Sequence, residues 1–302
     1  MNSIEQLSSR SLYGINKELI TIKYNKKNRT LNIRKVGALL SYIKHGYFSR
    51  IINRTKEFAG VDNHIMSEYT LKEYESYPNV KVVVYTCIWG KYDRIQEPLY
   101  INPNIDYCII TDQKINESSN WKQIELPENI KRLELTPTEI NRYCKMLPHK
   151  LFPEYDYSLY IDGNIAVVTD MFPIIADMNG KGLGVHKYPL TDCIYDMGKS
   201  IVAGKKASEE CVYEQLKKYE NEGFPKHFGA YECNILVRNH NSKKCSQLME
   251  NWWEEFNLTS TKRDQLSFAY VLWKNKYNLD DIHILGSNVR LNPRFQILDH
   301  IR

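Results

Sequence analysis

The chain has 302 residues, of which 42% are hydrophobic and 25% charged, proportions typical of a globular protein and unlike those of a disordered or fibrous one. This length suits one large catalytic domain with a smaller appendage. Apolar runs stay well short of the ~18 residues that span a bilayer, and the N-terminus lacks the apolar core of a secretory signal. We therefore expect a cytoplasmic protein. Its seven cysteines form no C-x-x-C pair, which predicts reduced thiols.

Positive charge is concentrated near the N-terminus. Residues 1–60 carry twelve Lys and Arg against three Asp and Glu, an excess of nine positive charges in a chain whose net charge is +5. Over residues 35–54, apolar side chains recur at helical spacing between basic ones, which predicts a basic amphipathic helix. This helix could pack on the rest of the chain or on a partner, or adsorb to anionic lipid on the inner face of the membrane. The sequence contains no nucleic-acid-binding motif, and we expect no nucleic-acid partner.

From residue 79 onward, β-rich runs alternate with helical stretches. The predicted strands span residues 80–85, 107–111, 157–161, 182–186, 234–238 and 282–285. This alternation predicts an α/β fold, a Rossmann-type mixed, mainly parallel sheet flanked by helices, whose ligands bind beyond the carboxyl ends of the strands. We therefore divide the chain into a basic, partly helical extension, residues 1–78, and a catalytic domain, residues 79–302.

Two predicted helices carry charged residues. The first begins with a Thr-Pro-Thr-Glu capping box at residues 136–139, and its apolar face lies opposite Arg142 and Lys145. The second carries Asp264 and Gln265 in its first turn. Both helices therefore bring polar groups to the catalytic domain.

The strand predicted at residues 157–161 ends in Asp162-Gly163-Asn164. An acid at the end of a buried strand can reach a divalent ion, and a hard cation held by oxygen ligands neutralises the charge of a departing nucleoside diphosphate. The same residue types also favour the turn that ends a strand. From composition alone, the turn is the simpler interpretation.

Five runs of residues occur in the order found in a known family. They are residues 85–93 (YTCIWGKYD), 111–112 (TD), 142–152 (RYCKMLPHKLF), 157–163 (YSLYIDG) and 263–268 (RDQLSF). With these runs the chain resembles the glycosyltransferase-like family of plant turgor-regulation and seed-mucilage proteins and their bacterial relatives. The resemblance implies a GT-A fold, a nucleotide-sugar donor, and a divalent metal, Mn²⁺ or Mg²⁺, bound with the donor diphosphate. Asn164 replaces the second acid of the usual Asp-x-Asp motif.

The resemblance also implies which residues bind the donor. The nucleotide-facing positions match Tyr85, Thr86, Tyr92, Asp93 and Asp112. The positions that face the diphosphate or its metal match Arg142, Lys145, Asp162, Gly163 and Asn164. Without the resemblance, strand ends, an ordinary turn and a solvated helix face would account for the same residues.

Asp264 and Gln265 match an Asp-Gln pair that lies beside the sugars in GT-A enzymes, which implies a role as base or in orienting a sugar. A carboxylate in the first turn of a helix is equally explained by the helix macrodipole. His283 is similar to a late histidine that adds a metal ligand in several GT-A families, although a histidine in a short apolar strand more often packs. His186 and Lys187, at the end of another predicted strand, are candidates to contact the acceptor, or belong to an exposed loop.

The leading hypothesis is transfer of a hexose or related sugar from a nucleotide sugar to a cell-surface glycan, a polysaccharide or a lipid-linked acceptor. The alternative is a catalytically inactive module that binds a sugar nucleotide or a glycan, which Asn164 favours. A nucleotidyltransferase would need a glycine-rich, basic phosphate loop near the first strand, and the sequence has none. Loss of donor hydrolysis or transfer in Asp162→Ala would separate the first two.

Overall fold

The computed structural model describes residues 3–29, 68–71 and 79–300, and the amphipathic helix expected at residues 35–54 lies outside them. The elements, in chain order, are α1 (Ser3–Arg29), β1 (Val82–Ile88), β2 (Ile105–Thr111), β3 (Lys122–Gln123), α5 (Glu128–Lys131), α6 (Pro137–Met146), α7 (Pro148–Leu151), β4 (Tyr157–Ile161), β5 (Ile165–Val167), α8 (Phe172–Asp177), β6 (Leu183–Lys187), α9 (Ile194–Ala203), α10 (Glu209–Asn221), β7 (Tyr231–Asn239), α11 (Lys243–Leu258), α12 (Asp264–Lys274), η1 (Leu279–Asp281), β8 (Ile282–Ile284), η2 (Val289–Leu291) and β9 (Phe295–Ile297).

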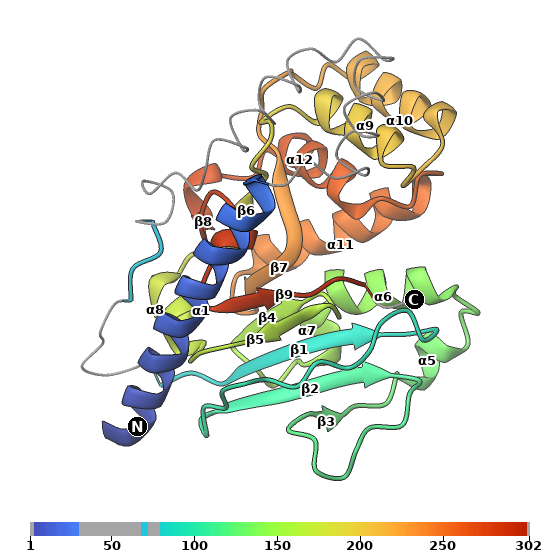
Figure 1. Ribbon diagram of the computed structural model, residues 1–302. Coiled ribbons are helices and arrows are strands. Elements are labelled where there is room, and N and C mark those ends of the chain that lie inside the picture. Colours follow the sequence, from blue (N-terminus) through green and yellow to red (C-terminus); the bar gives the residue numbers. More distant parts are fainter. Residues whose placement is uncertain (1–2, 30–67, 72–78, 301–302) are drawn as a thin grey trace.

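A seven-stranded sheet in the order β3-β2-β1-β4-β7-β6-β8 forms the centre of the structure (Figure 1). β7 is antiparallel to its neighbours β4 and β6, and the other neighbouring pairs are parallel. A second sheet pairs β5 with β9. The predicted mixed, mainly parallel sheet flanked by helices is therefore confirmed.

β1 shows why the chain folds this way. All seven of its residues are buried, as expected of a central parallel strand that is covered on both faces. Val83 and Tyr85 join the core that α6, α11 and α12 help to form, whereas Val82 and Val84 join the core on the other face, with α8. The sheet therefore separates two hydrophobic cores.

The predicted helix starts are also present. Thr136 accepts from the Glu139 backbone N–H, and the Glu139 side chain accepts from Thr136, which completes the predicted capping box of α6. The other helix, α12, begins at Asp264. Both helices therefore begin where the sequence predicts, which fixes the positions of Arg142, Lys145 and Asp264.

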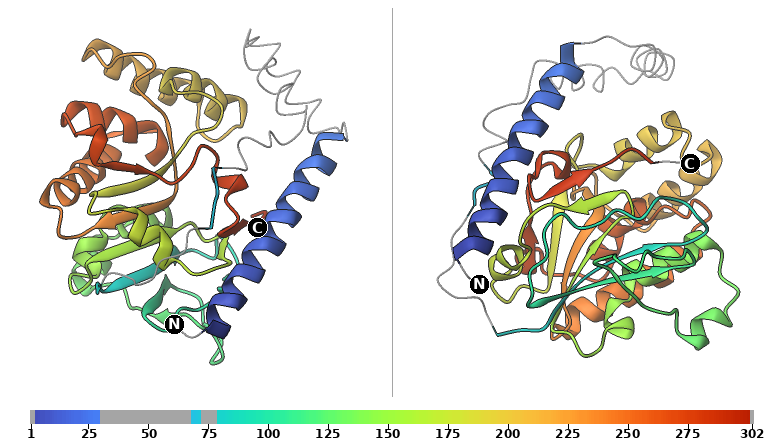
Figure 2. Two further views of the ribbon diagram at one scale, coloured as in Figure 1. Left: turned by 90° about the vertical axis from the view of Figure 1, so that its left-hand side faces the viewer. Right: turned by 60° about the horizontal axis from the view of Figure 1, so that its bottom comes forward.

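The N-terminal helix α1 packs along the outside of the α/β fold formed by residues 79–300 (Figure 2). Asn16 is buried and its side-chain amide donates to the Pro293 carbonyl at 2.8 Å and to the Phe295 carbonyl at 3.1 Å. Ser9 Oγ accepts from the Asp170 backbone N–H at 3.1 Å. These buried contacts dock the described part of the extension onto the domain. None of the described helices is long and apolar enough to cross a membrane.

Candidate functional site

Three carboxylates lie at the edge of the sheet where the parallel strands end. Asp162 follows β4, Glu232 lies near the start of the antiparallel β7, and Asp264 begins α12. The Asp162 backbone N–H donates to the Asn234 carbonyl at 2.9 Å, which ties the end of β4 to the start of β7. Sheets of this kind bind their ligands at this edge.

Asp162-Gly163-Asn164 forms a tight turn. The Ile165 backbone N–H donates to the Asp162 carbonyl at 2.9 Å, and a Cβ on Gly163 would lie 2.7 Å from the Ile88 side chain at the end of β1. The Asn164 side-chain amide donates to the Leu298 carbonyl at 2.8 Å. The turn uses backbone groups and leaves the Asp162 carboxylate, 31% exposed, at the site, so the turn and ligand interpretations are compatible.

Two cations from α6 lie between the end of β4 and the start of α12. Lys145 is 2% exposed, and its Nζ lies 2.7 Å from Asp264 Oδ2 and 3.4 Å from Asp162 Oδ1. Arg142 Nε lies 3.1 Å from Asp264 Oδ1. Neither residue belongs to a solvated helix face. The structure therefore brings together four of the predicted site residues.

The charge state of Asp264 follows from this pairing. Burial would raise the pKa of its carboxyl, but Arg142 and Lys145 outweigh burial and hold the pKa well below its usual range. Trp252 Nε1 and Ser267 Oγ both donate to the Asp264 backbone carbonyl, at 3.1 Å and 3.0 Å. Asp264 is thus a fixed, ionised bridge between two cations.

Two residues of β7, Glu232 and Asn234, also lie at this edge and were not predicted from the sequence. Gln265, one of the predicted residues, donates through Nε2 to the Tyr231 carbonyl at 2.9 Å and to Glu232 Oε2 at 3.1 Å. The Asn234 side-chain oxygen is buried and has no hydrogen-bond partner within residues 3–29, 68–71 and 79–300. The sequence signal was the alternation of polar Glu232 and Asn234 with apolar neighbours. It was missed because the strand was predicted to begin only at residue 234.

The loops after β1 and β2 contain the predicted nucleotide-binding residues. Asp112 accepts from the Gly90 backbone N–H at 3.0 Å, which links the two loops. Tyr92 is 54% exposed beside this link, whereas Asp93 is buried and its Oδ2 lies 2.9 Å from His300 Nδ1. Asp112 and Tyr92 are therefore the residues with exposed surface at this end.

Tyr85 and Thr86 lie inside the domain instead. Tyr85 is 0% exposed and donates through its hydroxyl to the Cys144 carbonyl at 2.8 Å, and Thr86 is 3% exposed. Their donor-binding role stays a prediction. In the structure, Tyr85 lies in the core and contacts α6 through its hydrogen bond to Cys144.

The predicted acceptor and metal residues occupy different places. His186 is 0% exposed, its Nε2 lies 3.0 Å from Asn292 Nδ2, and burial, assisted by Arg294 and His283, lowers its pKa to about 3. Lys187 lines a cavity of about 350 Å³ with Glu68 and residues 284–287. His283 lies in β8, opposite Gly184 of β6. The structure thus gives Lys187, and not His186, an exposed position.

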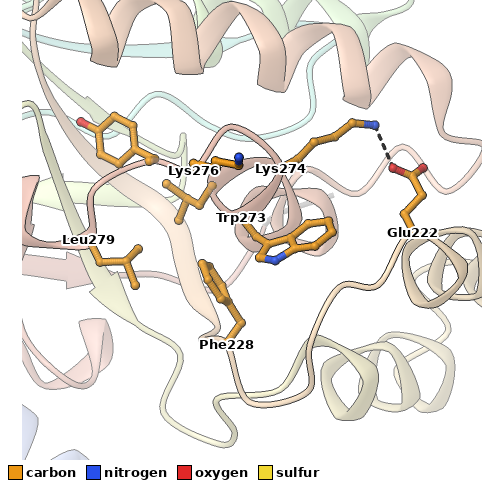
Figure 3. Close-up of a pocket in the computed structure, with 8 residues that line it drawn as sticks. Glu222, Phe228, Trp273, Lys274, Lys276 and Leu279 are labelled. Atoms are coloured by element: carbon orange, nitrogen blue, oxygen red, sulfur yellow. Dashed lines mark hydrogen bonds and ion pairs between the residues drawn. The ribbon is translucent and has the colours of Figure 1, made fainter.

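In the part of the chain that the structure describes, no group of three His, Cys, Asp or Glu is placed to hold a metal ion. A larger cavity, of about 540 Å³, lies at the far end of α12 from Asp264 (Figure 3). It is lined by Phe228 and Trp273 and bordered by the ion pair of Lys274 with Glu222, 2.9 Å apart. Because α12 has eleven residues, its two ends lie about 15 Å apart. The cavity at its C-terminal end is therefore distinct from the carboxylate edge at its N-terminal end.

A mainly parallel sheet with an acid after its central strand, and cations beside that acid, fits the GT-A class of glycosyltransferase folds. The TOD1/MUCI70 glycosyltransferase-like domain matches residues 65–289, and the chain belongs to this family. The resemblance read from the five runs is thereby confirmed. No curated protein sequence matches the chain.

Solved structures of glycosyltransferases are similar to this one. Mouse xyloside xylosyltransferase 1, in its apo form, shares 9% identity at a TM-score of 0.38, over 68% of this chain and 84% of that one. The mannosyltransferase Ktr4p from S. cerevisiae shares 11% identity at a TM-score of 0.37, over 74% of this chain and 76% of that one. Family membership rests on the sequence match.

Proposed function

We propose that the chain transfers a hexose or related sugar from a nucleotide-sugar donor to a cell-surface glycan, a polysaccharide or a lipid-linked acceptor. One observation carries the proposal: at the carboxyl edge of the sheet, Asp264 pairs with both Arg142 and the buried Lys145, and Lys145 also reaches Asp162. Membership of a glycosyltransferase-like family supports it.

The paired cations suit the chemistry of the leaving group. Negative charge develops on the departing nucleoside diphosphate, and positive charge fixed in a water-poor site stabilises it more than exposed charge does. Lys145 reaches both Asp162 and Asp264, so its ammonium group is held in place before the donor arrives. Tyr92 and Asp112 are exposed at the ends of β1 and β2, and in this proposal they contact the base and ribose.

A divalent cation, Mn²⁺ or Mg²⁺, fits this site through oxygen ligands. Asp162 offers its carboxylate, and Asn164 uses its amide nitrogen on Leu298, which leaves its side-chain oxygen for a metal. Such ions often take one or two protein oxygens and complete their shell with phosphate and water. When bound, the ion would neutralise charge on the diphosphate. His283 as a further ligand stays a prediction.

A panel of nucleotide sugars tests the function. Binding and release of nucleoside diphosphate are measured for UDP- and GDP-linked sugars, with and without Mn²⁺. We expect one donor to bind and to be hydrolysed slowly, and both properties to be lost in Asp162→Ala. The exposed Asp280→Ala, outside the site, serves as the control. Absence of binding and hydrolysis for every donor would contradict the proposal.

An inactive sugar-nucleotide or glycan-binding module is the second candidate. It is favoured by Asn164, which replaces an acid and is already bonded to Leu298. This candidate predicts donor binding that depends on Asp162 without release of nucleoside diphosphate in the presence of any tested metal. Hydrolysis by the wild type would rule it out.

We also propose that the basic extension places the chain peripherally at an anionic membrane, on the cytoplasmic face. The excess of nine positive charges in residues 1–60 supports this proposal, because each basic residue near an anionic surface contributes about 1 kcal/mol.

A further inference from the structure

The three carboxylates of the site differ in how strongly they are paired with cations, and therefore in how readily each can accept a proton. Both Asp264 oxygens are ion-paired, one with Arg142 at 3.1 Å and the other with Lys145 at 2.7 Å. A carboxylate held in its ionised form by two cations is a weak proton acceptor, since basicity falls as the pKa falls. Asp264 is therefore poorly suited to take a proton from an acceptor hydroxyl.

Asp162 belongs to the donor side of the site. It lies 3.4 Å from Lys145 and follows the central strand, and the function proposed above assigns it to the donor diphosphate and its metal. In an in-line displacement, the departing group and the incoming hydroxyl lie on opposite faces of the reacting carbon. A side chain that faces the diphosphate is therefore not placed to receive the proton.

Glu232 lies on β7, between the strand that leads into Asp162 and the strand that ends at Lys187. Its strand, β7, is hydrogen-bonded to β4 on one side and to β6 on the other. In the register with β6, Glu232 pairs with His186, and the next residue of β6 is Lys187, which lines the 350 Å³ cavity. The strand of Glu232 thus lies between β4, which leads into Asp162, and β6, whose last residue lines that cavity.

The Glu232 carboxylate is positioned without being neutralised. Gln265 Nε2 donates to its Oε2 at 3.1 Å, and no other side chain in the described ranges hydrogen-bonds it. Burial raises the pKa of Glu232, Arg290 and Lys206 lower it, and Asp162 raises it. The net result is a raised pKa, which makes a carboxylate a better base near neutral pH.

We propose that Glu232 is the proton acceptor of glycosyl transfer, and that Asp264 is a positioning residue that holds Arg142 and Lys145. This proposal rests on the function proposed above. The acceptor O–H bond breaks and its proton moves to a Glu232 oxygen, while the acceptor oxygen forms a bond to the anomeric carbon. The bond from that carbon to the phosphate oxygen breaks, and the nucleoside diphosphate leaves with the electron pair. The configuration at the anomeric carbon is inverted.

Gln265 is a second positioning residue. Its amide bonds both the Tyr231 carbonyl and Glu232, so it fixes the side chain of Glu232 relative to the backbone of the same strand. The amide donates one hydrogen bond to Oε2 and leaves Oε1 available to an acceptor hydroxyl.

The test uses the nucleotide sugar that the wild type hydrolyses, with water as the acceptor. Glu232→Gln keeps the shape of the side chain and removes the base, so hydrolysis should fall by about a hundredfold or more while affinity for UDP or GDP is unchanged. Formate should restore part of the rate in Glu232→Ala. Glu214→Gln, an exposed position on α10, is the control.

Two further readouts separate a base from a structural residue. The wild-type rate should rise with pH through an apparent pKa above about 4.3, the ordinary value for Glu, and Glu232→Gln should lack this dependence. NMR of the released sugar should show inversion. Normal hydrolysis by a folded Glu232→Gln, or retention of configuration, would overturn the role of Glu232 and leave the proposed function standing. A wild type that turns over no nucleotide sugar would overturn both.

Discussion

At Asp264, burial raises the pKa of the carboxyl and pairing with two cations lowers it, and the pairing has the larger effect. The residue is 6% exposed, so its ionised form depends on Arg142 and Lys145. The dependence is mutual, because Lys145 is buried, Arg142 is largely shielded from water, and both need a counter-charge. Mutual pairing explains how three charged side chains persist in a buried position, and it predicts that removing one of the charges destabilises the fold.

We expect Asp264→Asn to lower the free energy of unfolding by about 3 kcal/mol or more, because it leaves two buried cations without their shared partner. Urea unfolding at neutral pH measures this. Glu220→Gln, in an exposed pair with Lys217, is the control and should change nothing measurable. Because the pKa of Asp264 is lower in the folded state than the unfolded value of about 3.9, its charge stabilises the fold above that pH, and this stabilisation is lost in acid. The difference in unfolding free energy between wild type and Asp264→Asn should therefore shrink below about pH 4. A difference that is independent of pH would contradict the ion-pair account.

Some residues of the site could be predicted from the sequence and others could not. Asp162, Arg142 and Lys145 were found because a strand end, a capping box and family-like runs place them. Glu232 was missed because nothing in a single strand shows which of its side chains faces a helix start that lies over thirty residues further along the chain. The burial of Tyr85 was likewise hidden, since its neighbours in the core come from α6 and β7.

At the scale of elements, the buried central strands were predictable, whereas three of the short strands were not. β1 and β4 are mainly apolar runs whose side chains are all buried, and both were expected from composition. β3, β5 and β9 contain two or three residues each, too few to show a period, and their pairing depends on distant partners. The antiparallel direction of β7 follows from tertiary packing and has no local signature.

Docking of α1 can be tested at Asn16. Asn16→Ala removes two hydrogen bonds and leaves the Pro293 and Phe295 carbonyls unpaired, which should lower the free energy of unfolding by about 1–3 kcal/mol. Leu19→Ala, at a position 52% exposed on the same helix, should change it by less than about 0.5 kcal/mol. Chemical denaturation measures both. Equal effects would mean that α1 is not held by these bonds.

Gly286 tests the packing of Tyr69 beside the Lys187 cavity. Gly286 has a φ of +140°, and a Cβ there would lie 2.4 Å from the Tyr69 ring. Gly286→Ala should therefore cost about 1–3 kcal/mol more stability than Gly180→Ala, where φ is +79° and no atom lies within 4 Å. In a Tyr69→Ala background, thermal unfolding should show a smaller cost of Gly286→Ala. An unchanged cost would show that the ring is not the obstacle.

At the scale of the whole molecule, the charge is divided. Residues 1–60 carry nine excess positive charges and the rest of the chain is net negative, so attraction to an anionic surface belongs to the extension. Replacing Lys35, Lys44, Arg50 and Arg54 with Gln should abolish cosedimentation with phosphatidylserine vesicles and spare donor hydrolysis. Wild-type binding should also weaken as salt is added. Equal binding to pure phosphatidylcholine vesicles would contradict the electrostatic account.

The central claim is that a nucleotide-sugar donor binds at the carboxyl edge of the sheet, and hydrogen exchange tests it most directly. Exchange is followed by mass spectrometry with and without the bound donor, or UDP or GDP in its place. The account predicts slower exchange in residues 88–93, 112–113 and 162–165, because these loops meet at that edge. Protection confined to residues 222–228 and 272–279, which border the larger cavity at the far end of α12, would contradict it.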